Sequence, residues 1–128
     1  MQWFGDFVGL LPQAVVVAKM IGERIRMPPF VAEFDRTSNI GRALVLTGDD
    51  GVTGFHLLQQ RIAAELRALG FEKLVDPDYR PHMTLLYDER HVGDKLVNPI
   101  RWWIRELVLV HSLLGRTHYN LLARFPLL

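Results

Sequence analysis

The sequence predicts an α+β fold in which antiparallel sheets carry helices on their outer side. Two segments have the 3.6-residue apolar periodicity of helices, several shorter ones alternate as strands do, and turn residues separate them. The predicted order is a strand stub, a helix, two strands, a second helix and three strands. Helices separated by antiparallel strand pairs are typical of this fold class.

Length and composition indicate a single globular domain covering residues 1–128. The net charge of +1 argues against a strongly basic nucleic-acid arm but leaves a local phosphate site open. The absence of cysteine excludes disulfides and thiolate metal sites, and it favours a reducing, cytoplasmic compartment. No apolar run approaches the ~20 residues of a membrane span, and no targeting segment is visible.

The first half of the chain predicts one helix and one hairpin. Gln2-Trp3-Phe4, with two aromatic residues, is followed by Gly5-Asp6 and predicts the strand stub. Apolar residues spaced by three and four predict a helix from Pro12 to Arg24. Phe30 to Asp35 alternates as a half-buried strand, the turn is expected at Ser38 to Gly41, and Arg42 to Thr47 is the partner strand.

The second half begins with the clearest helix, which is expected from Gly54 to Leu69. Thr53 is a candidate N-cap and Gly70 a candidate left-handed stop. His56 lies off the apolar stripe of this helix and is expected to be solvated.

Three strands are predicted after this helix. The first runs from Arg80 to Asp88 and is followed by a polar loop from Asp88 to Asn98. Trp102 to Val110 has apolar residues on both faces apart from Arg105 and Glu106, which predicts a long central strand. Thr117 to Phe125 alternates and closes the sheet.

The strand from Arg80 to Asp88 carries the candidate chemistry. Period-two alternation points His82 and Thr84 to one face and Tyr87 to the other. An imidazole can move a proton near neutral pH, and a neighbouring hydroxyl can donate a hydrogen bond to an anionic oxygen. This pairing suits a phosphate ester, although a strand with two ordinary polar positions explains the same residues.

The segment Pro81-His82-Met83-Thr84-Leu85 resembles the second H-x-T motif of the two-histidine phosphoesterase superfamily, the LigT-like group with bacterial 2'-5' RNA ligases and cyclic nucleotide phosphodiesterases. The similarity extends in order over nearly the whole chain. The other segments that resemble the family are Pro29-Phe30-Val31, the strand at Ala43 to Leu46, the helix before the motif, Trp102 to Ser112, and the ending from Tyr119 to Leu127.

The resemblance implies a two-lobed fold in which two H-x-T motifs face each other across a cleft. One histidine acts as general base and the other as general acid, the threonines hold phosphate oxygens, and no metal or other cofactor is needed. It therefore implies that His82 and Thr84 are catalytic. Tyr87 and Phe4 are the candidates for binding the substrate by stacking on a base.

The sequence departs from this pattern because it contains a single H-x-T. The histidines at 56, 91, 111 and 118 are not followed by threonine at the second position. The resemblance places the first motif directly before a segment similar to residues 2–6, so the chain as printed is expected to be N-terminally shortened and to have weak activity or none. Either the first motif lies upstream of Met1, or the protein is a shortened, non-catalytic member of the family. Tyr87 also stands where many relatives carry a basic residue.

Three functions remain open at this point. The first is a metal-independent RNA phosphodiesterase or 2'-5' RNA ligase-like enzyme acting on 2',3'-cyclic phosphate or 2'-5' linked RNA ends. The second is a non-catalytic module that binds nucleotides or RNA ends, and the third is an assembly subunit. A metal site built from His82, His111 and His118 lacks any known ligand spacing.

A homodimer through an exposed sheet edge is also expected. A missing N-terminal strand would leave unpaired backbone groups beside Phe30 to Asp35 and Arg42 to Thr47, and such an edge invites pairing with another chain. Trp3 and Phe4 are the residues expected to contact the partner.

Overall fold

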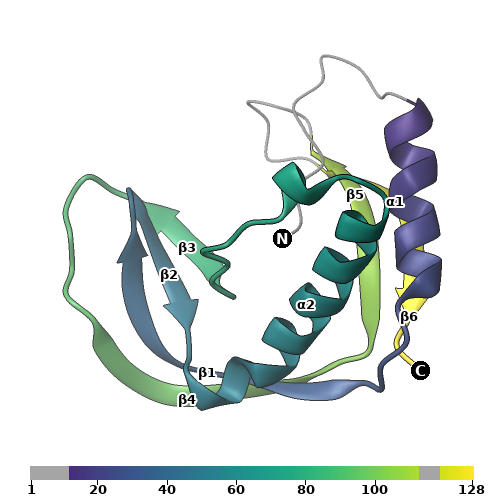
Figure 1. Ribbon diagram of the computed structural model, residues 1–128. Helices are drawn as coiled ribbons and strands as arrows, with labels where there is room; N and C mark the ends of the chain where they lie inside the picture. The colour runs from purple at the N-terminus through teal and green to yellow at the C-terminus, as the bar shows by residue number, and fades with distance from the viewer. Residues whose placement is uncertain (1–11, 113–118) are drawn as a thin grey trace. The chain divides into compact units, whose positions relative to one another are not determined.

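The computed structural model describes residues 12–112 and 119–128, and these form an α+β fold with antiparallel sheets (Figure 1). The main elements are α1 (Pro12–Arg24), β1 (Phe30–Ile40), β2 (Ala43–Thr47), α2 (Thr53–Ala68), β3 (Met83–Tyr87), β4 (Lys95–Ile104), β5 (Glu106–Ser112) and β6 (Tyr119–Pro126). The chain divides into a first unit (Met1–Pro29, Leu58–Asp76, Arg105–Leu128) and a second unit (Phe30–Leu57, Pro77–Ile104).

In the first unit, α1 packs against the antiparallel pair β5–β6. Ala18 and Ile21 on α1 are buried, as its apolar periodicity predicts. Gly22 permits a close approach to β6, because a Cβ at this position would lie 2.5 Å from the Phe125 ring. The predicted bounds of this helix are confirmed.

The predicted second helix is confirmed as α2 to within one residue at each end. Its buried residues, Leu58, Ile62, Ala63 and Leu66, lie along one face. Gly70, at φ 84°, ends the helix, and the Phe71 N–H donates to the Leu66 carbonyl at 2.8 Å, as in a Schellman motif. The Thr53 hydroxyl donates to the Asp50 carbonyl at 2.9 Å.

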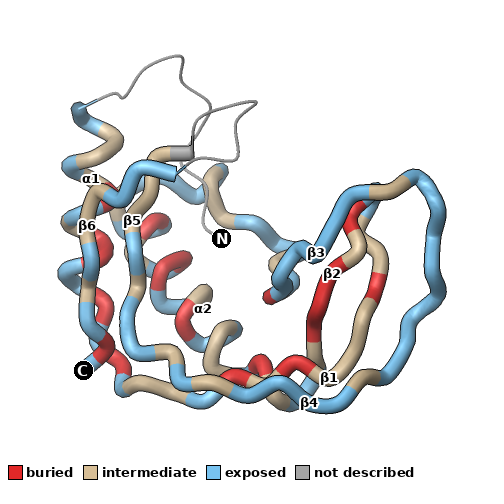
Figure 2. The backbone as a smooth tube through the Cα atoms, turned by 180° about the vertical axis from the view of Figure 1, so that it is seen from behind, coloured by how far each residue is buried: buried red, intermediate tan, exposed pale blue. Residues whose placement is uncertain are grey.

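The second unit is built on a four-stranded antiparallel sheet in the order β3-β2-β1-β4. Its core contains Phe34, Leu46 and Val52, with Phe55 and Trp102 packed against them. The rings of Phe34 and Trp102 meet edge to face at 5.1 Å. Figure 2 shows β2 largely buried and β3 largely exposed, so the sheet is covered at its centre and open at its edge.

Three boundaries differ from the predictions. The expected turn at Ser38 to Gly41 is wrong, because β1 continues to Ile40 and only Gly41 and Arg42 turn the chain, with Gly41 at φ 56°. The polar stretch after Asp88 is not entirely a loop, since β4 begins at Lys95 and pairs with Thr37.

The third difference concerns the expected central strand from Trp102 to Val110. The chain leaves one sheet and enters another at Arg105, so β4 pairs with β1 and β5 pairs with β6. Each half therefore exposes one apolar face, as Trp103 (55% exposed) and Val108 (43% exposed) show. Apolar residues on both faces had predicted a central position, but here they reflect a strand that changes sheets.

The expected open edge beside Phe30 to Asp35 and Arg42 to Thr47 is also wrong. Each of these strands has a neighbour on both sides, because β4 flanks β1 and β3 flanks β2. In the described part of the second unit, the edges are β3 and β4. Trp3 and Phe4 lie outside the described residues.

We expect Gly54→Ala to destabilise the second unit, because a Cβ at this position would lie 2.1 Å from the Phe30 ring, which itself packs on Phe55. Overpacking of this kind costs about 1–3 kcal/mol, which outweighs the ~1 kcal/mol gained in helix propensity. Urea unfolding measures the change in the free energy of unfolding. Gly93→Ala is the matched control, since no atom of the described residues lies within 4 Å of its added Cβ; equal stability of the two variants would contradict the close packing.

Candidate functional site

The H-x-T segment lies at the edge of the sheet in the second unit. His82 directly precedes β3, and Thr84 is the second residue of that strand. Both side chains are exposed to solvent, and neither is packed in the apolar core. The roles of His82 and Thr84 in catalysis stay predictions.

One hydrogen bond determines the tautomer of His82. Its Nδ1 lies 2.6 Å from the carbonyl oxygen of Arg80. Because a carbonyl can only accept, Nδ1 must be the donor, and in the neutral ring the lone pair is then on Nε2. The ring therefore presents Nε2 as the atom that can accept a proton.

The backbone before His82 is also held from inside the sheet. Thr47, at the end of β2, is buried, and its hydroxyl donates to the Pro81 carbonyl at 2.8 Å. Successive carbonyls of this segment thus have different partners: the Arg80 carbonyl accepts from the His82 ring, and the Pro81 carbonyl accepts from Thr47. These two bonds restrain the peptide that carries the imidazole.

A β-bulge decides which side chains share a face with Thr84. Thr84 pairs with Val45 and Tyr87 pairs with Ala43, so Leu85 is an extra residue in β3. Ala43 and Val45 are two residues apart and lie on one face of β2, which places Thr84 and Tyr87 on that same face. The prediction that Tyr87 faces away from Thr84 is therefore wrong, because regular alternation does not survive a bulge.

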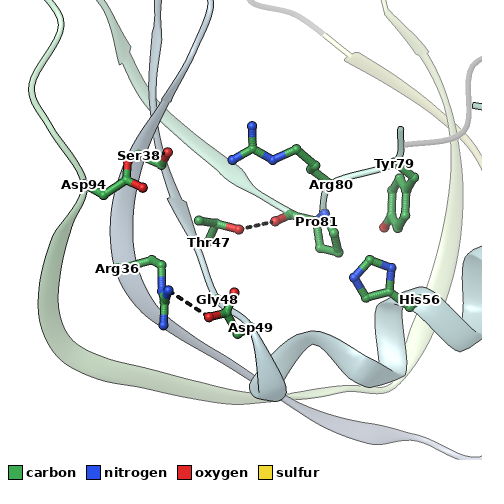
Figure 3. A pocket seen from close by; sticks show the side chains of 10 residues that line it. All are labelled: Arg36, Ser38, Thr47, Gly48, Asp49, His56, Tyr79, Arg80, Pro81 and Asp94. Carbon is green, nitrogen blue, oxygen red and sulfur yellow. Dashed lines mark hydrogen bonds and ion pairs between the residues drawn. The ribbon is translucent and has the colours of Figure 1, made fainter. Parts of the chain in front are cut away.

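A polar cavity of about 270 Å³ opens in the second unit, beside the H-x-T segment (Figure 3). Its lining includes Ser38 of β1 and Thr47 of β2, which lie on the same sheet face as Thr84 through the pairs Ser38–Val45 and Val45–Thr84. The residues just before His82 also line it, namely Tyr79, Arg80 and Pro81.

Most charged groups around this cavity have a partner. The Arg36 Nη1 lies 2.8 Å from an oxygen of Asp49, and the Ser38 hydroxyl donates to Asp94 at 2.8 Å. A hydrogen bond from Arg36 also holds the pKa of Asp35 below its usual value. In the described part of the chain, no residue pairs with the guanidinium of Arg80, and Figure 3 shows it joined to none of the labelled groups.

An aromatic pair forms another part of the lining. The rings of His56 and Tyr79 lie edge to face, with centroids 5.8 Å apart and planes at 83° (Figure 3). Burial raises the pKa of the Tyr79 phenol. His56 is exposed, as predicted, but it also lines the cavity, and no local sequence signal connects it to a tyrosine 23 positions later.

The other predicted site residues are placed as follows. Tyr87 is 75% exposed at the end of β3, whereas Phe4 lies outside the described residues. Across residues 12–112 and 119–128, no group of three His, Asp or Glu side chains could hold a metal ion. None of the helices in these ranges is long and apolar enough to pass through a membrane.

The sequence matches no protein-family model, and no curated protein matches it. Solved structures do match. TT0787 of Thermus thermophilus superposes with a TM-score of 0.73 at 23% identity, covering 93% of this chain and 73% of that one. E. coli LigT complexed with NADP+ gives a TM-score of 0.69 at 21% identity, covering 92% and 70%. A structure described as a phosphoesterase gives 0.71 at 21% identity, covering 93% and 71%.

These likenesses show that the chain has the LigT-like fold, as the resemblance around Pro81 to Leu85 implied. E. coli LigT has also been solved with ATP, with 3'-AMP and with phosphate.

We expect Thr47→Val to loosen the segment before His82, because it keeps the shape of the side chain but leaves the Pro81 carbonyl without its donor. Leaving a buried acceptor unsatisfied costs about 1–3 kcal/mol of stability. Thr47→Ser retains the hydroxyl and is the matched control. Denaturant unfolding should show a larger loss for valine than for serine; the opposite order would mean that the methyl group, and not the hydrogen bond, matters.

Alkaline titration should locate the pKa of the Tyr79 phenol above the value of about 10 that an unfolded tyrosine has. A raised pKa leaves stability unaffected well below the unfolded pKa, and stability falls as pH rises above it because the unfolded phenol ionises first. The difference in phenolate absorbance between wild type and Tyr79→Phe isolates this group. A difference curve centred at the unfolded value would show that the ring is not buried in solution.

Proposed function

We propose that this protein is a metal-independent phosphodiesterase or 2'-5' RNA ligase-like protein that acts on RNA ends carrying a 2',3'-cyclic phosphate or a 2'-5' linkage. The observation that carries the proposal is the exposed His82-Met83-Thr84 sequence at a sheet edge of a LigT-like fold. The nucleotides solved with E. coli LigT, including 3'-AMP and ATP, support a nucleotide ligand for the same fold.

The chemistry of His82 follows from its tautomer. In hydrolysis of a 2',3'-cyclic phosphate, a water oxygen bonds to phosphorus and one ring P–O bond breaks. The Nε2 lone pair accepts the proton of the attacking water, while Nδ1 stays bonded to the Arg80 carbonyl. The Thr84 hydroxyl donates a hydrogen bond to a non-bridging oxygen, where charge accumulates in the transition state.

The second proton transfer limits the rate. The leaving 2' or 3' oxygen must gain a proton on the side of phosphorus opposite the attacking water, because displacement is in line. The printed sequence contains one H-x-T, and we propose that for this polypeptide the leaving oxygen takes its proton from water. A well-placed acid contributes about 10²–10⁴-fold, so we expect slow turnover.

Binding without turnover is the alternative function, and the exposed ring of Tyr87 is the observation behind it. The bulge in β3 brings Tyr87 to the face of Thr84, and Tyr87 is 75% exposed. We propose that its ring stacks on a base next to the phosphate, a contact worth about 1–3 kcal/mol. Such a site would hold an RNA end even where its chemistry is slow.

We expect His82→Ala to abolish hydrolysis of adenosine 2',3'-cyclic phosphate and to leave the fold intact, because the side chain is exposed. Thr84→Val should lower kcat/KM by about 10–100-fold, the value of a hydrogen bond to a charged group. Product formation is followed by chromatography, and calorimetry measures binding of the same ligand.

The control is His91→Ala, which removes an exposed histidine from the segment between β3 and β4. Its turnover should equal that of the wild type. If His82→Ala retains full turnover, His82 is not the acid–base group; if the wild type binds the nucleotide but does not hydrolyse it, the binding-module alternative is correct.

A further inference from the structure

We propose that the polar cavity of the second unit binds the phosphate next to the reacting one, with Arg80 as its ligand. The preferred substrate is then an RNA end of two or more nucleotides, and a mononucleotide cyclic phosphate uses only part of the site. This inference rests on the proposed function, since it takes the H-x-T residues as the place of the reacting phosphate.

Arg80 is a cation of the cavity lining that can still bind an anion. Among the charged side chains in the lining, Arg36 is paired with Asp49, and Asp94 accepts from Ser38. Arg80 has no such partner among the described residues. A planar guanidinium offers parallel N–H donors that match two oxygens of a phosphate.

The position of Arg80 in the chain couples the cavity to the H-x-T segment. Two extended residues span at most about 7 Å, so the Arg80 and His82 backbones are close neighbours. The Arg80 carbonyl itself holds the His82 ring, at 2.6 Å from Nδ1. Thr47 lines the cavity and also fixes the peptide between them through the Pro81 carbonyl at 2.8 Å. The segment from Arg80 to His82 is therefore held by these two hydrogen bonds and contributes both to the cavity and to the H-x-T site.

The sheet face that carries Thr84 also connects the H-x-T segment to the cavity. Thr84 shares its face with Ser38 and Thr47, which line the cavity. A strand of RNA whose reacting phosphate meets the Thr84 hydroxyl can therefore continue along this face to Arg80. The cavity volume of about 270 Å³ is slightly below the ~300–1,000 Å³ of pockets that enclose drug-sized ligands, and this suits one sugar-phosphate unit.

The test compares two ligands with and without a flanking phosphate. Adenosine 2',3'-cyclic phosphate lacks it, and the dinucleotide adenylyl-(3'→5')-adenosine 2',3'-cyclic phosphate has it. Binding is measured by calorimetry with the full chain carrying His82→Ala, so that no ligand is consumed. Arg80→Gln is compared with Arg42→Gln, an equal charge change at an exposed arginine that pairs with Glu89.

We expect Arg80→Gln to weaken dinucleotide binding by about 10–100-fold and to leave mononucleotide binding unchanged. The slope of log K against log salt should fall by about 0.7 for the dinucleotide, the value for one phosphate contact to a single strand. Arg42→Gln should weaken the binding of either ligand only by the small amount that follows from removing one distant positive charge. Circular dichroism tests whether both variants are folded.

An equal loss for both ligands, or a loss no greater than that of Arg42→Gln, would overturn the proposal. Failure of the proposed function gives a different pattern. If wild-type protein hydrolyses neither ligand but binds the dinucleotide in an Arg80-dependent way, the flanking-phosphate site stands and the catalytic role of His82 falls.

Discussion

The hydrogen bond from the buried Thr47 hydroxyl to the Pro81 carbonyl is the contact on which the candidate site depends. Thr47 ends β2, an interior strand, and is itself held in the sheet by its pair with Arg36. It therefore ties an exposed segment to the most buried strand. A side chain that must meet a phosphate within a fraction of an ångström benefits from such support, because loops alone position groups less well.

The edge position of β3 suits a binding surface. The strand is paired on one side only within the described residues, so its exposed side chains can reach a ligand. The extra residue Leu85 then brings Tyr87 to the face of Thr84, which regular alternation forbids. A bulge also hinders an edge strand from pairing with another chain. The bulge in β3 therefore affects both the placement of Tyr87 and the exposure of the sheet edge.

The sequence predicts those parts of the structure that depend on local patterns. Both helices follow from their apolar periodicity, and the stop at Gly70 follows from the ability of glycine to adopt positive φ. The local signal for the change of sheets is the charged pair Arg105-Glu106 within the apolar run, and this pair alone does not show that the two halves belong to separate sheets. Periodicity likewise does not predict the aromatic contact of His56 with Tyr79. It also does not predict that the Arg80 guanidinium lines the cavity without a partner among the described residues.

His82 is proposed to offer an unprotonated Nε2 to a phosphate, and nitrogen-15 NMR of the histidine rings can detect which nitrogen carries the proton. In spectra recorded at a pH of about 8 or above, where an ordinary imidazole is neutral, we expect the proton of the His82 ring on Nδ1. Adding adenosine 2',3'-cyclic phosphate should shift the Nε2 resonance of His82 and leave His91 unchanged. A His82 ring protonated on Nε2, with no response to the nucleotide, would show that His82 does not offer this atom to a phosphate.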